Sequence, residues 1–316
     1  MSEYQYYEFM TVDRPLTRDQ IAELRQLSTR ADISSTRFVN EYHWGDFRGD
    51  PNVLIERYFD AHLYLANWGT HRLMFRLPAS ALELKTAELY CVCDEATVRA
   101  HGAYVIIDLQ ADDEAGEHDY YDGPSTLGSF ISARAELAAG DHRLLYLAWL
   151  LSMQWVDLER DDQDLDEVEP PLPSGLGELT GSLQSVVEFL RIDTELLAVA
   201  AEGSPSAPRT VEKLLVAAAA RRRDHENAVA DGKRREYEQR MESLVQQGDK
   251  LWRRVDALIG SKKTTEYDIA VTVLKSLRDS ARWAGTSDEF EARIRQIRAG
   301  YSNRPGLLRR LDDAEL

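Results

Sequence analysis

Residues 4–12 read Tyr-Gln-Tyr-Tyr-Glu-Phe-Met-Thr-Val, and this aromatic and β-branched run is typical of a β-strand. A helix is expected next, because Thr17 and Gln20 have the spacing of a capping box, in which each side chain bonds the other residue's backbone amide. Residues 36–44 then alternate between apolar and polar side chains, which favours a second, half-buried strand. The chain therefore opens with a strand, a helix and a strand.

The sequence predicts further short strands and one helix up to about residue 109. Pro51 suits the first turn of a helix that runs to about Asn67, and Gly69 is expected to end it. Apolar, β-branched runs indicate three further strands, at 72–77, 88–93 and 102–109. This order of elements predicts an α+β fold, with a mixed sheet of ferredoxin-like character and helices on one of its faces.

Helical spacing replaces the strand pattern after residue 123, with a break near Gly140. Residues 144–151 are apolar on nearly every side, which predicts a buried helix. Beyond the Pro-rich bridge at 170–173, an amphipathic helix and a short helix capped by Asp193 are expected to cover the sheet. No strand pattern is present after Pro208.

The C-terminal third has the patterns of a helical arm. Near-heptad spacing from Tyr237 to Ile259 indicates a long helix or a helical hairpin, and Thr265 and Ser287 are residue types that cap two shorter helices. We therefore predict an α+β domain at 1–123, a helical cover at 124–203, a linker at 204–209 and an all-helical arm at 210–316.

Charge is distributed unevenly along the 316 residues, whose formal net charge is −17. Residues 1–205 hold 15 Lys and Arg against 37 Asp and Glu, a net charge of −22, whereas residues 206–316 hold 23 against 18, a net charge of +5. A strongly negative surface repels the phosphates of nucleic acids. We therefore expect a basic protein as the partner of the first part, and nucleic-acid binding only through the C-terminal arm.

Two acidic blocks, at 108–122 and 157–169, and two basic triplets carry much of this asymmetry. Each block is either a solvated run or a docking surface for a partner of opposite charge. The second block resembles a calcium loop, but Glu167 stands where such a loop needs Gly and Pro173 where it needs a bidentate Glu. The side chains predicted to contact partners are Asp112, Asp113, Glu114, Asp161, Asp162, Asp164, Asp166, Arg221, Arg222, Arg223, Lys233, Arg234 and Arg235.

A hydrolase is the alternative function, because residues 40–50 hold the densest mixture of polar and aromatic side chains. In that interpretation a His acts as a base or metal ligand and an Asp orients it. The plainer interpretation makes the Asp residues turn or cap residues and assigns Trp44 and Phe47 to a core corner. The four candidates for the hydrolase site are His43, Asp46, Asp50 and His71.

Other catalytic signatures are missing from the sequence. It contains no phosphate-binding or dinucleotide-binding glycine loop, no serine-hydrolase elbow and no metalloprotease His pair. Cys91 and Cys93 would point to opposite faces of a strand, and zinc needs four ligands, so we expect no cofactor and no metal. The start lacks a signal-peptide pattern, and no run reaches the roughly 18 apolar residues of a membrane span, so we expect a cytoplasmic protein without membrane contact.

The stretch from Phe38 to Gly69, which includes Asn40-Glu-Tyr-His-Trp-Gly-Asp-Phe-Arg-Gly-Asp50, resembles a family of bacterial hypothetical proteins over roughly the first 200 residues. This resemblance implies no particular chemistry. Residues 267–311 more loosely resemble the helical tail of bacterial proteins that carry a SWIM zinc finger, a module associated with nucleic acids or protein contacts. The Cys-Val-Cys run at 91–93 supplies at most half of that zinc pattern, so the resemblance implies no zinc function here.

The sequence as a whole therefore favours binding over catalysis. We predict a non-catalytic adaptor or regulatory subunit that engages other proteins through an acidic surface and a helical arm, for instance within a nucleic-acid-handling assembly. The sequence leaves the oligomeric state open.

Overall fold

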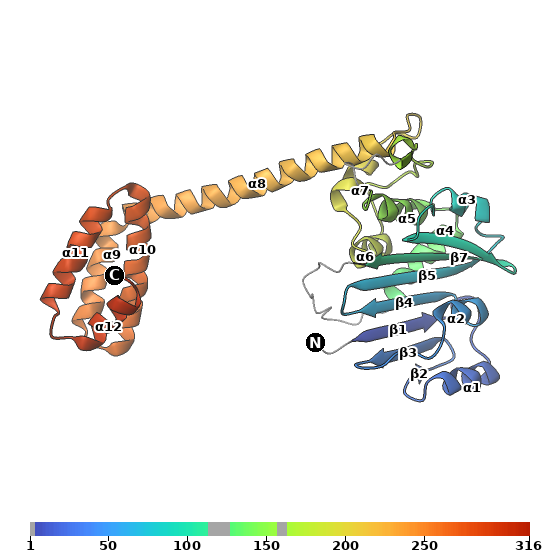
Figure 1. Cartoon of the computed structure of the whole chain (residues 1–316), viewed down its shortest axis with the longest axis horizontal. Coiled ribbons are helices and arrows are strands. Elements are labelled where there is room, and N and C mark those ends of the chain that lie inside the picture. The colour runs from blue at the N-terminus through green and yellow to red at the C-terminus, as the bar shows by residue number, and fades with distance from the viewer. Residues whose placement is uncertain (1–3, 113–126, 157–162) are drawn as a thin grey trace. The chain divides into compact units, whose positions relative to one another are not determined.

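The structure, a computed structural model, describes residues 4–112, 127–156 and 163–316 of the chain (Figure 1). Its N-terminal part contains a seven-stranded antiparallel sheet and its C-terminal part is helical, so the predicted α+β class with a helical C-terminal region is confirmed. The strands are β1 Gln5–Met10, β2 Asp32–Ile33, β3 Arg37–Tyr42, β4 Ala61–Ala66, β5 Thr70–Pro78, β6 Ala96–His101 and β7 Tyr104–Asp112.

The strand order is β2-β3-β1-β4-β5-β7-β6, and the neighbouring strands all pair antiparallel, so the sheet is not mixed. β1 and β2 both oppose β3, which lies between them, and helix α1 (Arg18–Leu27) connects them. In the same way β3 and β4 flank β1 and are connected through α2 (Pro51–Arg57). Two interleaved β-α-β units of this kind give the first four strands the expected ferredoxin-like arrangement.

The helix predicted from Pro51 to Asn67 is wrong beyond Arg57. Asp50 caps α2 and Pro51 occupies its first turn, but residues 61–66 form β4, which pairs with β1 on one side and β5 on the other. A strand with two neighbours has its backbone groups hydrogen-bonded along both edges, and the helices on the two sides of the sheet bury its faces. These long-range pairings outweigh the helical spacing of the apolar residues.

The strand predicted at 88–93 is also wrong. Residue 88 ends a short helix, α3 (Leu84–Glu88), and the strand in this part of the chain is β6. β6 and β7 form a hairpin whose turn contains Gly102 at a φ of +59°, a conformation that favours glycine. Gly102, the predicted first residue of the strand at 102–109, therefore lies in the turn between β6 and β7.

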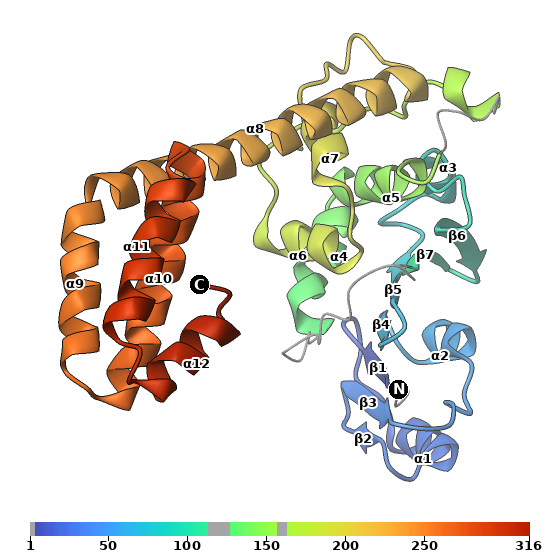
Figure 2. The same cartoon turned by 60° about the vertical axis from the view of Figure 1, so that its left-hand side comes forward.

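Helices cover both faces of the sheet, whereas the sequence indicated one (Figure 2). α1 and α2 cover the face that carries Phe9, Phe38 and Met74, because alternate residues of a strand point to opposite sides. Residues such as Leu63 and Phe75 point to the other face, where the expected helical cover lies. The covering helices are α4 Ile131–Ala138, α5 Arg143–Met153, α6 Gly181–Phe189 and α7 Thr194–Ala201.

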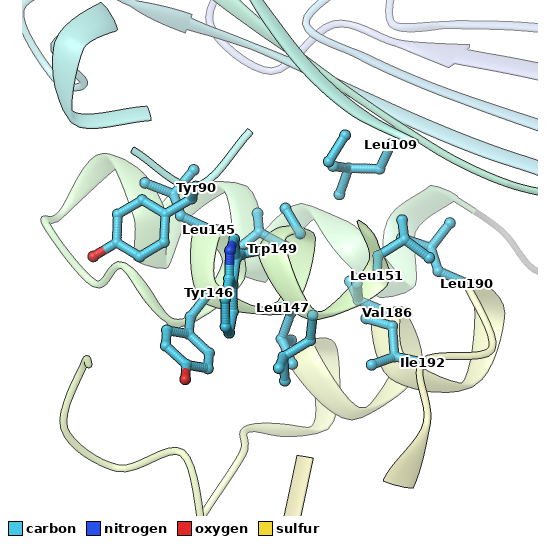
Figure 3. Close-up of a cluster of buried hydrophobic side chains, with 14 of the residues drawn as sticks. Tyr90, Leu109, Leu145, Tyr146, Leu147, Trp149, Leu151, Val186, Leu190 and Ile192 are labelled. Carbon is cyan, nitrogen blue, oxygen red and sulfur yellow. The ribbon is translucent and has the colours of Figure 1, made fainter. Parts of the chain in front are cut away.

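The centre of the larger core is α5, in which every residue from Leu144 to Met153 is buried. Figure 3 shows its side chains between Leu109 of β7 on one side and Val186 of α6 with Ile192 on the other. A helix that is apolar all round needs such neighbours on every side. The prediction of a buried helix at 144–151 is therefore confirmed.

The chain divides into two compact units, which we call unit 1 (Met1–Arg222) and unit 2 (Arg223–Leu316). The boundary lies inside a helix and not at 204–209, because Val211 and Leu214 at the start of that helix belong to the core around α5. Among the described residues no strand follows residue 210. The remaining helices are α8 Val211–Gln246, α9 Gly248–Gly260, α10 Thr264–Ala284, α11 Ser287–Gly300 and α12 Pro305–Asp313.

Unit 2 has its own hydrophobic core, in which Val255 of α9, Leu274 of α10 and Ile294 of α11 are buried. The caps predicted at Thr265 and Ser287 are not formed, since α10 and α11 begin at Thr264 and Ser287 without a side-chain cap bond. The first turns of α10 and α11 are instead stabilised by packing, since Tyr267 and Phe290 are buried in the core of unit 2. Within the described ranges, no helix combines the length and apolar composition needed to cross a bilayer.

Candidate interaction site

One end of the sheet gathers segments that are distant in sequence. Gln5 at the start of β1 pairs with Tyr42 at the end of β3 and with Ala66 at the end of β4. Beside them, Thr70 at the start of β5 pairs with Asp112, the last residue of β7. The described residues just beyond these pairs, which are Tyr4, 43–46 and 67–69, therefore lie at the same end of the strands, which we call the sheet end.

Aromatic side chains occupy the sheet end. The ring centroid of Tyr4 lies 5.4 Å from that of His43, which in turn lies 6.4 Å from that of Trp44. The backbone amide of Tyr4 donates to Oδ1 of Asn67 at 2.9 Å, which ties the start of β1 to the turn that carries Trp68. Trp44 is 73% exposed and Trp68 is 45% exposed, so both tryptophans face solvent.

Both tryptophans are held in glycine turns. Gly45 follows Trp44 with a φ of +78°, and Gly69 follows Trp68 with a φ of +104°. Left-handed backbone of this kind is readily adopted only by glycine. The Trp-Gly pairs in the sequence are thus turn signals, and the first of them could have corrected the assignment of Trp44 to a core corner.

Exposed carboxylates lie at the sheet end as well. Glu41, Asp46 and Asp112 are all exposed. Burial, followed by the negative charge of Glu41, raises the pKa of Tyr4, and burial together with several nearby groups, including Asp46 and Asp112, raises the pKa of Tyr64. The sheet end is therefore both aromatic and electronegative.

Lys and Arg are absent from the stretches 4–7, 40–47, 64–71 and 111–112 that form the sheet end, and the next one along the loop of Trp44 is the exposed Arg48. The first arginine inward along β5 is Arg72, whose guanidinium donates to both oxygens of Asp108, at 2.8 and 2.5 Å. That pairing raises the pKa of Arg72 and neutralises its charge locally. The negative field of the sheet end is thus not balanced by these segments.

A polar network holds the loop that carries Trp44. The side-chain amide nitrogen of Gln5, Nε2, donates to Oδ1 of Asp46 at 3.1 Å and to the backbone carbonyl of Gly45 at 3.3 Å. Its Oε1 accepts from the hydroxyls of Tyr7 at 2.7 Å and Tyr64 at 3.1 Å. Gln5 is buried, so this one side chain fastens the loop to the sheet. The sequence analysis missed Gln5, since its partners become neighbours only through strand pairing.

The four hydrolase candidates are not brought together. Asp50 accepts from the amide of Asn52 at 2.8 Å as the cap of α2, and Asp46 serves the loop anchor. His71 is buried, with Nδ1 at 3.0 Å from the carbonyl of Gly69 and its ring edge-on to Phe189 at 5.1 Å. His43 and His71 extend from strands β3 and β5, which are three spacings of about 4.8 Å apart, so about 14 Å separates their backbones.

Residue types that can ligate metals, and the thiols, lie in the described part of the chain. Across it, no three His, Cys, Asp or Glu side chains form a group that could hold a metal ion. Burial raises the pKa of the Cys91 thiol to about 12, which keeps it protonated and poorly nucleophilic at neutral pH.

The acidic residues predicted to contact partners fall into two groups. Asp112 and Asp166 are described and exposed. The other members, Asp113, Glu114, Asp161, Asp162 and the side chain of Asp164, lie outside the described residues.

The predicted basic residues lie on α8, and several of them have acidic partners. Arg221 donates to Glu195 at 2.9 Å and to Glu202 at 2.7 Å, and Arg222 forms an ion pair with Asp193. These bonds fasten α8 to α7 within unit 1. In the second triplet, Arg234 pairs along the helix with Asp231 at 3.0 Å, while Lys233 and Arg235 are exposed.

Comparison with known proteins adds no further information on function. No family model, no curated protein and no solved structure matches this chain. The two sequence resemblances therefore stay predictions.

Proposed function

We propose that the protein is a non-catalytic adaptor or regulatory subunit that binds other proteins. The observation that carries this proposal is the middle of α8, where every residue from 221 to 230 is exposed. A helix that is polar on all sides buries no apolar stripe and typically bridges folded parts of a chain. Each unit has its own core, so the protein has two separately built surfaces to offer to partners.

Charge supports a basic partner for unit 1. Residues 1–222 hold 19 Lys and Arg against 38 Asp and Glu, a net charge of −19, whereas residues 223–316 hold 19 against 17, a net charge of +2. Complementary potentials steer encounter and suppress partners of the wrong sign. A basic protein therefore fits unit 1 better than any polyanion does.

The contacts of the hydrolase candidates also support binding over catalysis. Asp46 anchors a loop, Asp50 caps a helix, and His71 lies buried beside Phe189. A general base has to approach its orienting group and its substrate within hydrogen-bond reach. Three of the four candidates instead have structural partners on different elements.

Partner capture from the organism that encodes the chain tests the proposal. The intact chain with a C-terminal tag is mixed with an extract of that organism. A reagent that couples carboxylates to lysines is added, and the tagged chain is then purified together with any protein cross-linked to it. We expect one basic protein, cross-linked through carboxylates of unit 1, whose retention without cross-linker falls as salt rises from about 0.05 M to about 0.5 M. A control bait of similar net charge identifies proteins held by bulk charge alone, and recovery of the chain without a specific partner contradicts the proposal.

A further inference from the structure

Trp44 and Trp68 at the sheet end are both exposed, so burial in the core does not account for these large apolar side chains. Phe47, in the same loop as Trp44, is 9% exposed and packs on Tyr7 with ring centroids 5.0 Å apart. The loop can therefore bury an aromatic ring, yet Trp44 is the most exposed large hydrophobic side chain among the described residues. Leaving that much apolar surface in water forgoes stabilisation, and tryptophan is enriched among side chains that anchor partners.

The surroundings of the tryptophans identify the charge of the partner. Glu41, Asp46 and Asp112 are exposed at the sheet end, and the stretches 4–7, 40–47, 64–71 and 111–112 that form it contain no Lys or Arg, with Arg48 the next basic residue in the loop of Trp44. A cation over an indole face is attracted by the ring quadrupole, and a guanidinium also stacks on it. Carboxylates at the same end of the sheet can bind neighbouring guanidinium groups through their N–H groups. Arginine side chains thus fit this surface in both respects.

Hydrogen bonds also hold the loops of the sheet end in the unbound chain. Gln5 fastens the loop of Trp44 through Asp46 and Gly45, and Asn67 fastens the turn of Trp68 to the amide of Tyr4. A surface that is already ordered loses less conformational entropy on binding. The tryptophans are therefore presented in fixed turns.

We propose that the sheet end recognises an arginine-rich segment of a partner protein, with guanidinium groups stacked on Trp44 and Trp68 and bound by Glu41 and Asp112. This inference rests on the proposed function, for which it names the contact surface and the chemistry of the partner. It also sets lysine apart from arginine, because an ammonium group carries the same charge but does not stack as a planar group.

Binding of a fluorescein-labelled hexa-arginine peptide to the intact chain tests the inference by fluorescence anisotropy at low salt. We expect saturable binding accompanied by a change in tryptophan fluorescence, and weaker binding of a hexa-lysine peptide. The double variant Trp44→Ala/Trp68→Ala should bind hexa-arginine about tenfold more weakly, the combined effect of two exposed cation–π contacts. Its near-ultraviolet circular dichroism and thermal midpoint show whether it is folded.

Matched controls separate the sheet end from the rest of the surface. Trp155 is 54% exposed, belongs to unit 1 and follows the end of α5, outside the segments that form the sheet end, so Trp155→Ala should leave the affinity unchanged. Glu41→Gln/Asp112→Asn should weaken binding several-fold, whereas Glu83→Gln/Glu88→Gln, which removes the same charge around α3, should not.

Three results would overturn the inference: no saturable binding of hexa-arginine, equal binding of hexa-lysine, or equal loss in the Trp155→Ala variant. If hexa-arginine binds but the sheet-end variants keep full affinity, another acidic surface of unit 1 is the contact site, and the adaptor function stands. If the native partner is absent as well, the adaptor function fails with it. The two proposals can therefore fail separately.

Discussion

His62 of β4 is a buried base with one unsatisfied nitrogen. Its Nδ1 lies 2.9 Å from the carbonyl of Glu8, its ring stacks on Phe9 at 4.0 Å, and its Nε2 has no hydrogen-bond partner. Burial, helped by the charge of Arg72, lowers its pKa to about 3. In the unfolded chain a histidine titrates near pH 6.5, so below that pH the unfolded state binds the extra proton and acid favours unfolding.

We expect His62 to make the fold acid-sensitive. The free energy of unfolding should fall between about pH 7.5 and about pH 4.5, and the His62 contribution to that fall should be about 2.5–3 kcal/mol. His62→Gln keeps a hydrogen-bond donor and does not titrate, so urea unfolding of both proteins at the two pH values isolates this contribution. An equal loss of stability in wild type and variant would contradict the expectation.

Asp60 and Arg76 form an ion pair inside unit 1, with Nη2 and Oδ1 2.7 Å apart and both side chains almost fully buried. Burial favours the neutral acid, but the amides of Val12 and Asp13 together with Arg76 outweigh it and lower the pKa of Asp60. The pair is thus charged and fully engaged in the folded chain.

Removing one member of this pair should be costly. Arg76→Met leaves Asp60 as an uncompensated buried charge, and we expect the free energy of unfolding to fall by about 3–5 kcal/mol. The matched change Arg57→Met breaks an exposed pair with Glu23, 3.6 Å apart, and should cost less than about 1 kcal/mol. Urea denaturation measures both, and similar losses in the two variants would show that burial does not govern the cost.

At the scale of elements, Asp193 joins two helices. Its Oδ1 accepts from the amides of Glu195 and Leu196 at 2.8 and 3.1 Å, which caps α7, and its Oδ2 pairs with Arg222 of α8. Asp193→Ala should lower the free energy of unfolding by about 1–2 kcal/mol. Asp193→Asn retains the capping oxygen and loses only the exposed ion pair, so it should lose less than about 1 kcal/mol.

A residue at the equivalent position of α11 provides the control. Thr286 precedes that helix but makes no side-chain cap bond, so Thr286→Ala should leave stability nearly unchanged. Unfolding of Asp193→Ala, Asp193→Asn and Thr286→Ala in guanidinium chloride measures the free energy of unfolding of each variant and so ranks the three losses. If Thr286→Ala lowers the free energy of unfolding as much as Asp193→Ala does, the cap hydrogen bonds of Asp193 do not account for its effect on stability.

At the scale of the whole molecule, the two cores are expected to unfold independently. Leu147 is fully buried in the core around α5, and Leu274 is fully buried in the core of unit 2. Each Leu→Ala change removes packing worth about 2–5 kcal/mol. Calorimetry should resolve two transitions, with Leu147→Ala lowering the temperature of one and Leu274→Ala that of the other. A single transition that both variants shift equally would show one cooperative unit.

Local signals in the sequence were enough for several parts of this fold. The capping box of Thr17 and Gln20, the cap at Asp193 and the buried helix at 144–151 depend on residues within a few positions of one another, and the structure contains all three. The helical C-terminal region follows from the same kind of short-range pattern. For these elements, the residues that stabilise the structure are also neighbours in the chain.

Long-range pairing accounts for what sequence reasoning missed. Residues 61–66 become a strand because β1 and β5 bond to them, and β1 is more than 50 residues away in sequence. The sheet end, with Gln5 beside Asp46 and Tyr4 beside His43, exists only once those strands are paired. Helical spacing can be read from one segment, whereas strand pairing and the exposure of Trp44 and Trp68 depend on which distant segments come to lie next to each other.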